Sequence, residues 1–201
     1  MIIFDLDGTL IDSSERMYRL FQDLVPESTF SKEEYWRLKR NKINHKVLLQ
    51  MYFPDRDFEE FNKKWLSLIE TEKYMLLDQN YPDTLEVLAN LKHKGEYLCL
   101  LTARQSRTML MQELERLKID SYLDRVLTTE HKCTKVELFQ SLSSINTQED
   151  FAVSDMGIDI LNAKQYGYHT VAITHGFMNE KNLSTYHPDR IIHELAELLL
   201  I

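Results

Sequence analysis

Residues 2–13 read Ile-Ile-Phe-Asp-Leu-Asp-Gly-Thr-Leu-Ile-Asp-Ser. The apolar start predicts a short buried strand that ends at Asp5, and Asp7 follows before Gly8 and Thr9 break the strand pattern. Two carboxylates this close repel each other, so both stay ionised only if a cation or strong hydrogen-bond donors lie between them. Strand ends that open into turns are typical positions for sites in parallel α/β sheets. A surface Asp-x-Asp-Gly turn is the non-functional alternative.

Composition narrows the class of protein. The chain has 201 residues and a formal charge of −8, which disfavours general nucleic-acid binding. Cys99 and Cys133 show neither metal-ligand spacing nor a disulfide framework, which favours a reducing compartment. No apolar run approaches the ~20 residues needed to span a bilayer, and a strand that starts at residue 2 leaves no room for a signal peptide. We expect a cytoplasmic protein with neither a nucleic-acid nor a membrane partner.

Glycine usage separates one segment from the rest of the chain. All five glycines lie outside residues 14–79. Apolar spacing within that segment predicts four helices. The first carries apolar residues between 17 and 24, and Ser31 opens the second with a capping box to Glu34. The third is marked by Val47, Leu48, Met51 and Tyr52, and the fourth by apolar positions between 58 and 69.

Helices and strands alternate from residue 82 onward. Strands are predicted at 97–101, 124–127, 151–154 and 170–173, each preceded by a helix. This alternation predicts an α/β fold with a doubly wound parallel sheet that has helices on both faces. The first strand belongs to the same sheet. We therefore expect an α/β core of residues 1–13 and 80–201, with an all-α cap of residues 14–79 inserted into it.

Two later strand ends also carry polar residues. The strand at 97–101 is followed by Thr102, Ala103 and Arg104, where a hydroxyl and backbone N–H groups could hold an anion. The strand at 151–154 is followed by Asp155, with Asp159 four residues later. An N-cap would explain Asp155 alone, but not the repeat of an acidic pair at a strand end.

A lysine lies close to the third predicted strand. Thr134 and Glu137 form a capping box, so Thr134 is the expected N-cap and Lys135 lies in the first helical turn. A cation there opposes the helix dipole, which suggests a compensating role beside the carboxylates. Lys132, on the preceding loop, is the rival candidate, and a solvated surface lysine is the alternative for either.

Four segments, in this order, resemble the motifs of the haloacid dehalogenase superfamily of phosphohydrolases. They are Asp5-Leu-Asp7-Gly8-Thr9-Leu10, Leu100-Leu101-Thr102, Lys135, and Val153-Ser154-Asp155 with Asp159. The insertion lies where the subfamily that resembles phosphoglycolate phosphatase carries its helical, C1-type cap. The resemblance covers the whole chain and implies a Rossmann-like core.

The resemblance also implies a mechanism. Asp5 would attack the phosphorus of a phosphomonoester, and Asp7 would protonate the leaving oxygen and then activate water. Mg²⁺ would bind Asp5, the backbone carbonyl of Asp7, and Asp155. Asp159 would orient metal-bound water or Lys135 without binding the metal itself. Thr102, Ala103 and Lys135 would hold the phosphoryl oxygens. A carboxylate needs such cations, because repulsion from a phosphate costs ~4 kcal/mol per charge pair at ~4 Å and an effective dielectric of ~20.

Two departures from the family pattern leave alternatives open. Ser154 stands where the fourth motif usually has glycine, and Lys132-Cys133 replaces the usual Lys-Pro pair. The acid Asp7 favours phosphate chemistry over dehalogenation, but a phosphomutase of the same superfamily would share it. Two alternative functions belong to other classes of protein. One is a receiver-like binding module that accepts a phosphoryl group, and the other is a catalytically inactive scaffold.

The cap is expected to supply substrate contacts. Its most basic stretch, residues 37–46, includes Arg40, Lys42 and His45. Arg104, beside the second motif, could touch the leaving group. The expected partner is a small phosphate ester, and the expected assembly a monomer or homodimer. The sequence does not identify which ester.

Overall fold

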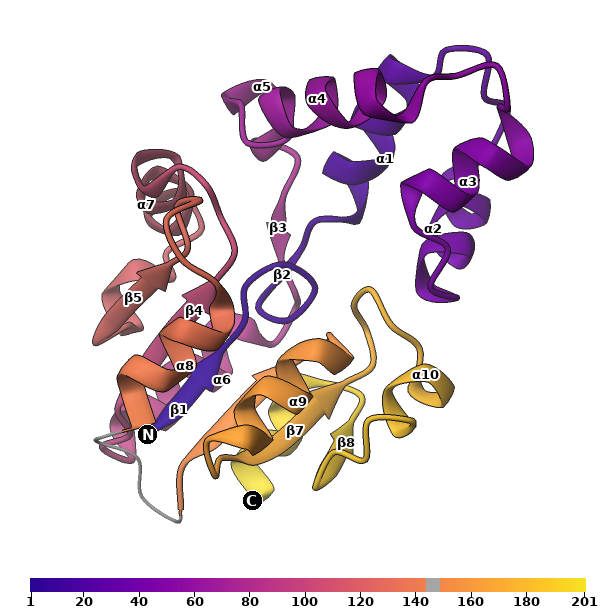
Figure 1. The fold of residues 1–201 in the computed structure, drawn as a ribbon. Helices are drawn as coiled ribbons and strands as arrows, with labels where there is room; N and C mark the ends of the chain where they lie inside the picture. The colour runs from indigo at the N-terminus through magenta and orange to yellow at the C-terminus, as the bar shows by residue number, and fades with distance from the viewer. Residues whose placement is uncertain (144–148) are drawn as a thin grey trace.

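A single parallel sheet forms the centre of the molecule (Figure 1). The computed structural model describes residues 1–143 and 149–201. Six parallel strands occur in the order β5-β4-β1-β6-β7-β8. Their bounds are β1 Ile2–Phe4, β4 Leu98–Thr102, β5 Arg125–Thr128, β6 Phe151–Ser154, β7 His169–Ile173 and β8 Arg190–Ile192. The predicted doubly wound α/β fold is confirmed.

Helices cover both faces of this sheet because its strands are apolar on both sides. Ile2 and Phe4 of β1 face a cluster that includes α6 (Thr84–His93), α7 (Arg107–Arg116) and the 3-10 helix η2 (Leu195–Leu200). Ile3 faces a second cluster with α8 (Lys135–Ser143) and α9 (Gly157–Gln165). The 3-10 helix η1 (Asp120–Tyr122) and α10 (Glu180–Ser184) lie in connections at the periphery.

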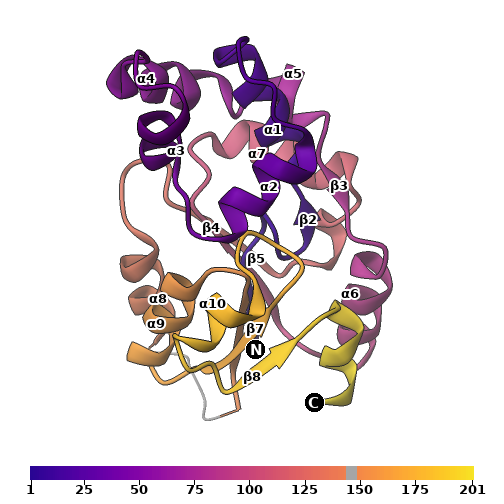
Figure 2. The same ribbon diagram turned by 90° about the vertical axis from the view of Figure 1, so that its right-hand side faces the viewer.

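The segment between β1 and α6 forms a separate helical layer (Figure 2). It contains α1 (Ser14–Leu24), α2 (Lys32–Arg40), α3 (His45–Tyr52), α4 (Phe58–Leu68) and the short α5 (Glu72–Met75). These helices enclose their own hydrophobic cluster, which includes Phe21, Tyr35, Leu48, Phe61 and Trp65. The predicted capping box at Ser31 is present, since the Glu34 N–H donates to Ser31 Oγ and the Ser31 N–H to Glu34 Oε2.

A small antiparallel ribbon joins the two layers. Strand β2 (Ile11–Asp12) leads into α1, and β3 (Gln79–Asn80) leads out of α5. Ile11 pairs with Asn80 and Asp12 with Gln79, so the chain enters and leaves the helical layer at one place. We propose this ribbon as the boundary between the cap and the core.

Some predicted details differ from the structure. Met51 and Tyr52 are 59 % and 44 % exposed, and the buried face of α3 is formed by Leu48 and Leu49. The fifth helix α5 and the strands β2, β3 and β8 were not predicted, because segments of two to four residues show no measurable periodicity. Among the described residues, no helix has both the length and the apolar character needed to cross a bilayer.

Candidate active site

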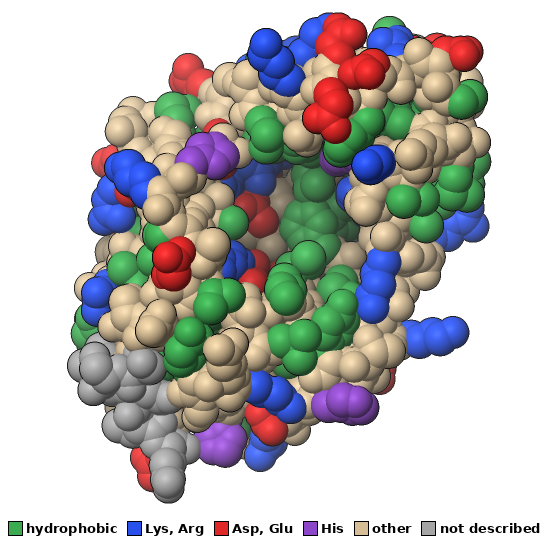
Figure 3. Space-filling model, viewed as in Figure 1, with side chains coloured by type: hydrophobic (Ala, Val, Ile, Leu, Met, Phe, Trp, Pro, Cys, Tyr) green, Lys and Arg blue, Asp and Glu red, His purple; other side chains and the backbone are tan. Residues whose placement is uncertain are grey.

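Three adjacent strands, β4, β1 and β6, bring the polar residues of the sequence motifs together. Asp5 follows β1, Thr102 ends β4, and Asp155 follows β6. The chain runs from β1 to β4 and β5 on one side of the sheet and then crosses to β6 on the other side of β1, and such a switch point opens a crevice at the carboxyl ends of the strands. The surface is hollowed between the helical layer and the sheet, with acidic and basic side chains in its depth (Figure 3).

Lys135 links two carboxylates at the base of this hollow. Its Nζ lies 2.7 Å from Asp5 Oδ1 and 2.7 Å from Asp159 Oδ2. The lysine is the first residue of α8, and the capping box is present: the Thr134 N–H donates to Glu137 Oε2, and the Glu137 N–H to Thr134 Oγ1. Because the helix start is fixed, the lysine side chain extends from a fixed position toward the two acids.

Lys132 lies in a different environment. Its side chain is 78 % exposed, and its Nζ pairs with Glu130 Oε2 at 2.6 Å. Of the two candidate lysines, the structure places Lys135 among the carboxylates and Lys132 at the surface.

Asp5 is buried, and the hydrogen bonds it accepts from described side chains go to Oδ1. Oδ2 is therefore the oxygen left for an incoming group. Burial, together with the charges of Asp159 and Asp7, raises the pKa of Asp5 to about 7 against the lowering effect of Lys135. A carboxylate in this position needs additional positive charge to be fully ionised at neutral pH.

Asp155 is fully buried among neutral donors. Thr9 Oγ1 donates to its Oδ1 at 3.2 Å, and the Phe177 N–H donates to its Oδ2 at 2.6 Å. Burial, followed by the charge of Asp5, raises its pKa well above the usual range. Gly8 and Gly176 leave room for this carboxylate, since a Cβ at either would lie 2.2 Å from Asp155 Oδ2. Gly8 also has φ +79°, a conformation that favours glycine.

The charges around Asp5 fit a bound cation. Asp5, Asp155 and Asp159 bring three carboxylates, and Lys135 brings one ammonium. In the described part of the chain, no three His, Cys, Asp or Glu side chains converge as a metal site. Asp5 and Asp155 are carboxylates at neighbouring strand ends, and carboxylate oxygens suit a hard divalent cation.

The loop after β4 carries the predicted phosphate contacts and one contact that was not predicted. Thr102 is buried at the strand end and Ala103 is exposed. Glu70, between α4 and α5, accepts hydrogen bonds of 2.8 and 3.0 Å from the Gln105 N–H and one of 2.9 Å from the Ser106 N–H. A carboxylate at a helix start is favoured by the helix dipole. These hydrogen bonds connect the helical layer to the loop that precedes α7.

Two guanidinium groups hold the Asp7 side chain. Arg104 Nε donates to Asp7 Oδ2 at 2.7 Å, and its Nη2 donates to Oδ1 at 2.9 Å. Arg16, in the first turn of α1, also donates to Oδ1. Burial alone would raise the pKa of Asp7, but Arg104 and Arg16 together lower it well below its usual range. The Arg104 guanidinium is buried against Asp7, and its contact with a leaving group stays a prediction.

Comparison with known proteins agrees with this geometry. A sequence model of haloacid dehalogenase-like hydrolases matches residues 2–173. The chain belongs to this family. A pyrophosphatase PpaX from Anoxybacillus flavithermus is 27 % identical over 214 residues, covering 100 % of this chain and 95 % of that protein.

Solved structures show the same fold. A haloacid dehalogenase-like hydrolase from Streptococcus pneumoniae superposes with a TM-score of 0.79 at 24 % identity, covering 99 % of this chain and 96 % of that one. A predicted phosphoglycolate phosphatase from Haemophilus somnus has a TM-score of 0.77 at 21 % identity, with coverage of 100 % and 96 %. The predicted family membership and enzyme class are confirmed.

In this haloacid dehalogenase-like hydrolase, Asp7 belongs to a larger buried ion cluster. Arg16 Nε and Arg104 Nη2 each lie 3.2 Å from Asp78 Oδ2, and Arg104 Nη2 lies 2.8 Å from Glu113 Oε2. Burial raises the pKa of Asp78 to about 9. Arg16 belongs to α1 of the helical layer and Asp78 to the linker between α5 and β3, whereas Arg104 precedes α7 and Glu113 lies on it.

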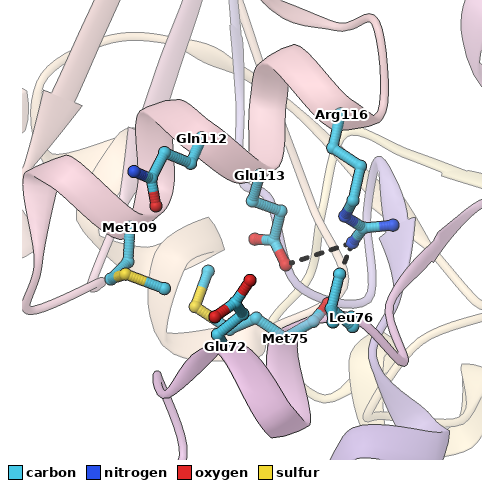
Figure 4. Close-up of a pocket in the computed structure, with 7 residues that line it drawn as sticks. All are labelled: Glu72, Met75, Leu76, Met109, Gln112, Glu113 and Arg116. Carbon is cyan, nitrogen blue, oxygen red and sulfur yellow. Dashed lines mark hydrogen bonds and ion pairs between the residues drawn. The ribbon is translucent and has the colours of Figure 1, made fainter.

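A cavity of about 260 Å³ lies beside this cluster, between α5 and α7 (Figure 4). Glu113 reaches into it from α7, and Met75 and Leu76 line the opposite wall. Arg116 spans the gap by donating to the Met75 carbonyl at 2.9 Å and the Asp78 carbonyl at 3.1 Å. Beside the cavity, where apolar packing is incomplete, hydrogen bonds from Arg116 join α7 to the segment that follows α5.

The three cap residues expected to bind substrate make contacts within the protein. Arg40 Nη2 donates to the Thr174 carbonyl at 2.5 Å, and Lys42 Nζ lies 4.7 Å from the centre of the Tyr186 ring. His45 Nε2 is 2.8 Å from the Tyr35 hydroxyl and belongs to the aromatic cluster of the helical layer. The sequence showed the charge of these residues, but not that Arg40 lies opposite Thr174 and Lys42 opposite Tyr186.

Proposed function

We propose that this hydrolase is a Mg²⁺-dependent phosphatase that cleaves a small phosphomonoester through an aspartyl-phosphate. The observation that carries the proposal is the position of Asp5, which is buried at the end of β1 with Oδ1 held by Lys135 and Oδ2 not engaged by the described side chains. The names of the relatives, a pyrophosphatase and a phosphoglycolate phosphatase, support phosphate chemistry.

In the first step, Asp5 Oδ2 attacks the phosphorus, and the bond from phosphorus to the ester oxygen breaks. Thr102, the Ala103 N–H and Lys135 hold the non-bridging oxygens as charge develops on them. Asp159, 2.7 Å from Lys135 Nζ, keeps that ammonium in position.

Asp7 serves both half-reactions. It delivers a proton to the departing ester oxygen, and its carboxylate then removes a proton from the water that attacks the aspartyl-phosphate. The ion pairs with Arg16 and Arg104 favour the carboxylate, and therefore the second role. A proton must reach Asp7 before it can assist a poor leaving group.

Asp5, Asp155 and the backbone carbonyl of Asp7 would hold Mg²⁺. The bound cation would neutralise the charge between carboxylate and phosphate, which otherwise repel by ~4 kcal/mol per charge pair at ~4 Å and an effective dielectric of ~20. Its ligands would be oxygens, which is the donor set that Mg²⁺ prefers.

Release of phosphate from p-nitrophenyl phosphate tests the proposal. We expect turnover with Mg²⁺, loss with EDTA, and inhibition by Ca²⁺, whose larger and more flexible shell misplaces the nucleophile. Asp5→Asn should abolish turnover while the fold, followed by circular dichroism, is kept. Turnover by a folded Asp5→Asn variant would disprove the covalent mechanism.

A substrate panel distinguishes the remaining alternatives. It should include pyrophosphate and phosphoglycolate, because relatives carry those names. Phosphoryl transfer to a sugar phosphate without release of free phosphate would indicate a mutase. A stable phosphoprotein that does not turn over would indicate a phospho-accepting module.

A further inference from the structure

Ser154 stands where the resemblance to the haloacid dehalogenase motifs implies glycine, and its side chain makes two hydrogen bonds at the end of β6. The hydroxyl accepts from the Met156 N–H at 3.0 Å and donates to Asp159 Oδ2 at 3.0 Å. The Ser154 side chain is buried. The hydrogen bond from the Met156 N–H holds Ser154 Oγ in place, so the hydroxyl proton is donated from a fixed position. A glycine could make neither contact.

The acceptor of this hydrogen bond is also the acceptor of Lys135. Asp159 Oδ2 receives both the Ser154 hydroxyl and the Lys135 ammonium, which is 2.7 Å away. Lys135 in turn contacts Asp5 Oδ1. The four residues form a chain of contacts from β6 through α9 and α8 to the end of β1.

We propose that Ser154 is a positioning residue that orients Asp159 and, through it, holds the Lys135 ammonium against Asp5. This inference rests on the proposed function, in which Lys135 stabilises the transferring phosphoryl group. A lysine side chain loses rotamer entropy when it is fixed, so a second contact with a rigid partner helps to hold it. Asp159 provides that anchor only if its own carboxylate does not rotate.

A purely structural role is the competing explanation. The contact between Ser154 and the Met156 N–H lies just before α9 and would stabilise the start of that helix. Both explanations predict some loss of stability when the hydroxyl is removed. They differ in what happens to the ammonium of Lys135.

Ser154→Ala and Ser154→Thr separate the two explanations. We expect Ser154→Ala to lower kcat about tenfold, the scale of one hydrogen bond to a charged group, and Ser154→Thr to keep most of the turnover because it keeps the hydroxyl. Ser31→Ala is the matched control. Like Ser154, Ser31 accepts a backbone N–H beside a helix start, but it is the exposed N-cap of α2. Ser31→Ala should lower stability and leave kcat unchanged.

The NMR signal of the Lys135 ammonium gives a readout that does not depend on turnover. Hydrogen bonds to two carboxylates slow the exchange of its protons with water, so the wild-type protein should show a resolved signal that Lys135→Arg removes. Ser154→Ala should broaden this signal and Ser154→Thr should retain it. An unchanged signal in Ser154→Ala would overturn the inference, whatever happens to kcat. Absence of any phosphatase activity would instead contradict the proposed function and leave this readout intact.

Discussion

Lys135 is the residue on which the charge balance around Asp5 depends. We predict that Lys135→Met lowers kcat at least ~100-fold, because removing one group aimed at developing charge costs on this scale. Lys132→Met is the control and should retain near-normal turnover, since Lys132 is 78 % exposed and pairs with Glu130. Steady-state kinetics with p-nitrophenyl phosphate measures both. A larger loss in Lys132→Met would mean that the third motif had been assigned to the wrong lysine.

Arg16 controls how readily Asp7 can carry a proton. Removing this guanidinium should raise the pKa of Asp7, so more of the protein would have the protonated acid that a poor leaving group needs. We predict that Arg16→Met raises kcat/KM for alkyl phosphates relative to p-nitrophenyl phosphate, by about tenfold for each pKa unit recovered. Arg104 still holds both oxygens of Asp7 in this variant.

Arg19→Met, on the same helix, is the matched control for Arg16. Arg19 is 62 % exposed and pairs with Glu15, so its loss should leave the ratio of the two rates unchanged. If Arg16→Met also left the ratio unchanged, the Arg16–Asp7 contact would have no influence on proton delivery.

Most of the candidate site is visible in the sequence because its residues follow strands. The carboxyl ends of parallel strands lie at one edge, so Asp5, Thr102 and Asp155 could be placed together without coordinates. Arg16, Glu70, Asp78 and Glu113 could not. Their partners lie in distant segments, as in the contact between Glu70 and Ser106, and each alone has the pattern of a solvated charge.

At the scale of elements, α2, α3 and α4 pack around His45. The centre of its ring lies 4.1 Å from the centre of the Trp65 ring and 5.2 Å from that of the Phe61 ring. Burial, with a contribution from Lys39, lowers the pKa of His45 well below 6.5. The unfolded chain therefore binds a proton that the folded cap excludes.

This difference predicts how stability depends on pH. A depressed folded-state pKa gives stability that is present above the unfolded pKa of about 6.5 and lost as pH falls toward the folded value. Protonation of His45 should therefore lower the melting temperature between pH 7 and pH 5, against the opposite effect of the raised pKa values of Asp5 and Asp78, and His45→Gln should remove this contribution to the slope. His93→Gln, at an exposed position of α6, should preserve it. An equal slope in wild type and His45→Gln would show that His45 does not contribute.

The elements that were predicted are those long enough to show a period. Helix α4 has apolar residues along one face, and β4 is an unbroken apolar run. Strands β2 and β3 have two residues each, and their pairing is determined by the convergence of two linkers. Such a ribbon depends on tertiary structure and leaves no local signal.

At the scale of the whole molecule, the helical layer also meets the sheet layer through α2. The Arg40 guanidinium contacts the Thr174 carbonyl, and the Asn182 amide donates to the Arg40 carbonyl at 2.9 Å. Trp36 packs on Phe177 with ring centres 5.0 Å apart. These contacts lie between α2 and the segment that follows β7.

This interface predicts an effect on closure. The double variant Arg40→Ala/Asn182→Ala should lower kcat/KM by about threefold to tenfold, the scale of one or two neutral or charge-assisted hydrogen bonds. The factor should be the same for a small phosphate ester with a neutral leaving group and for a substrate that carries negative charge beyond its phosphate. Arg37→Ala, exposed on the same helix, should have no effect. A rise in KM confined to the charged substrate would instead restore Arg40 as a direct substrate contact.

The place of β1 in the sheet also has a consequence for the order in which the chain can fold. Ile3 lies beside Cys99 on one side and Ala152 on the other, so the strand that carries Asp5 has no partner until much later residues have been synthesised. Residues 14–75, whose helices share a local cluster, can assemble while the rest of the chain is still emerging from the ribosome. The strand that carries Asp5 would then wait for both of its neighbours, and a nascent chain would carry a formed helical layer before it has a catalytic centre.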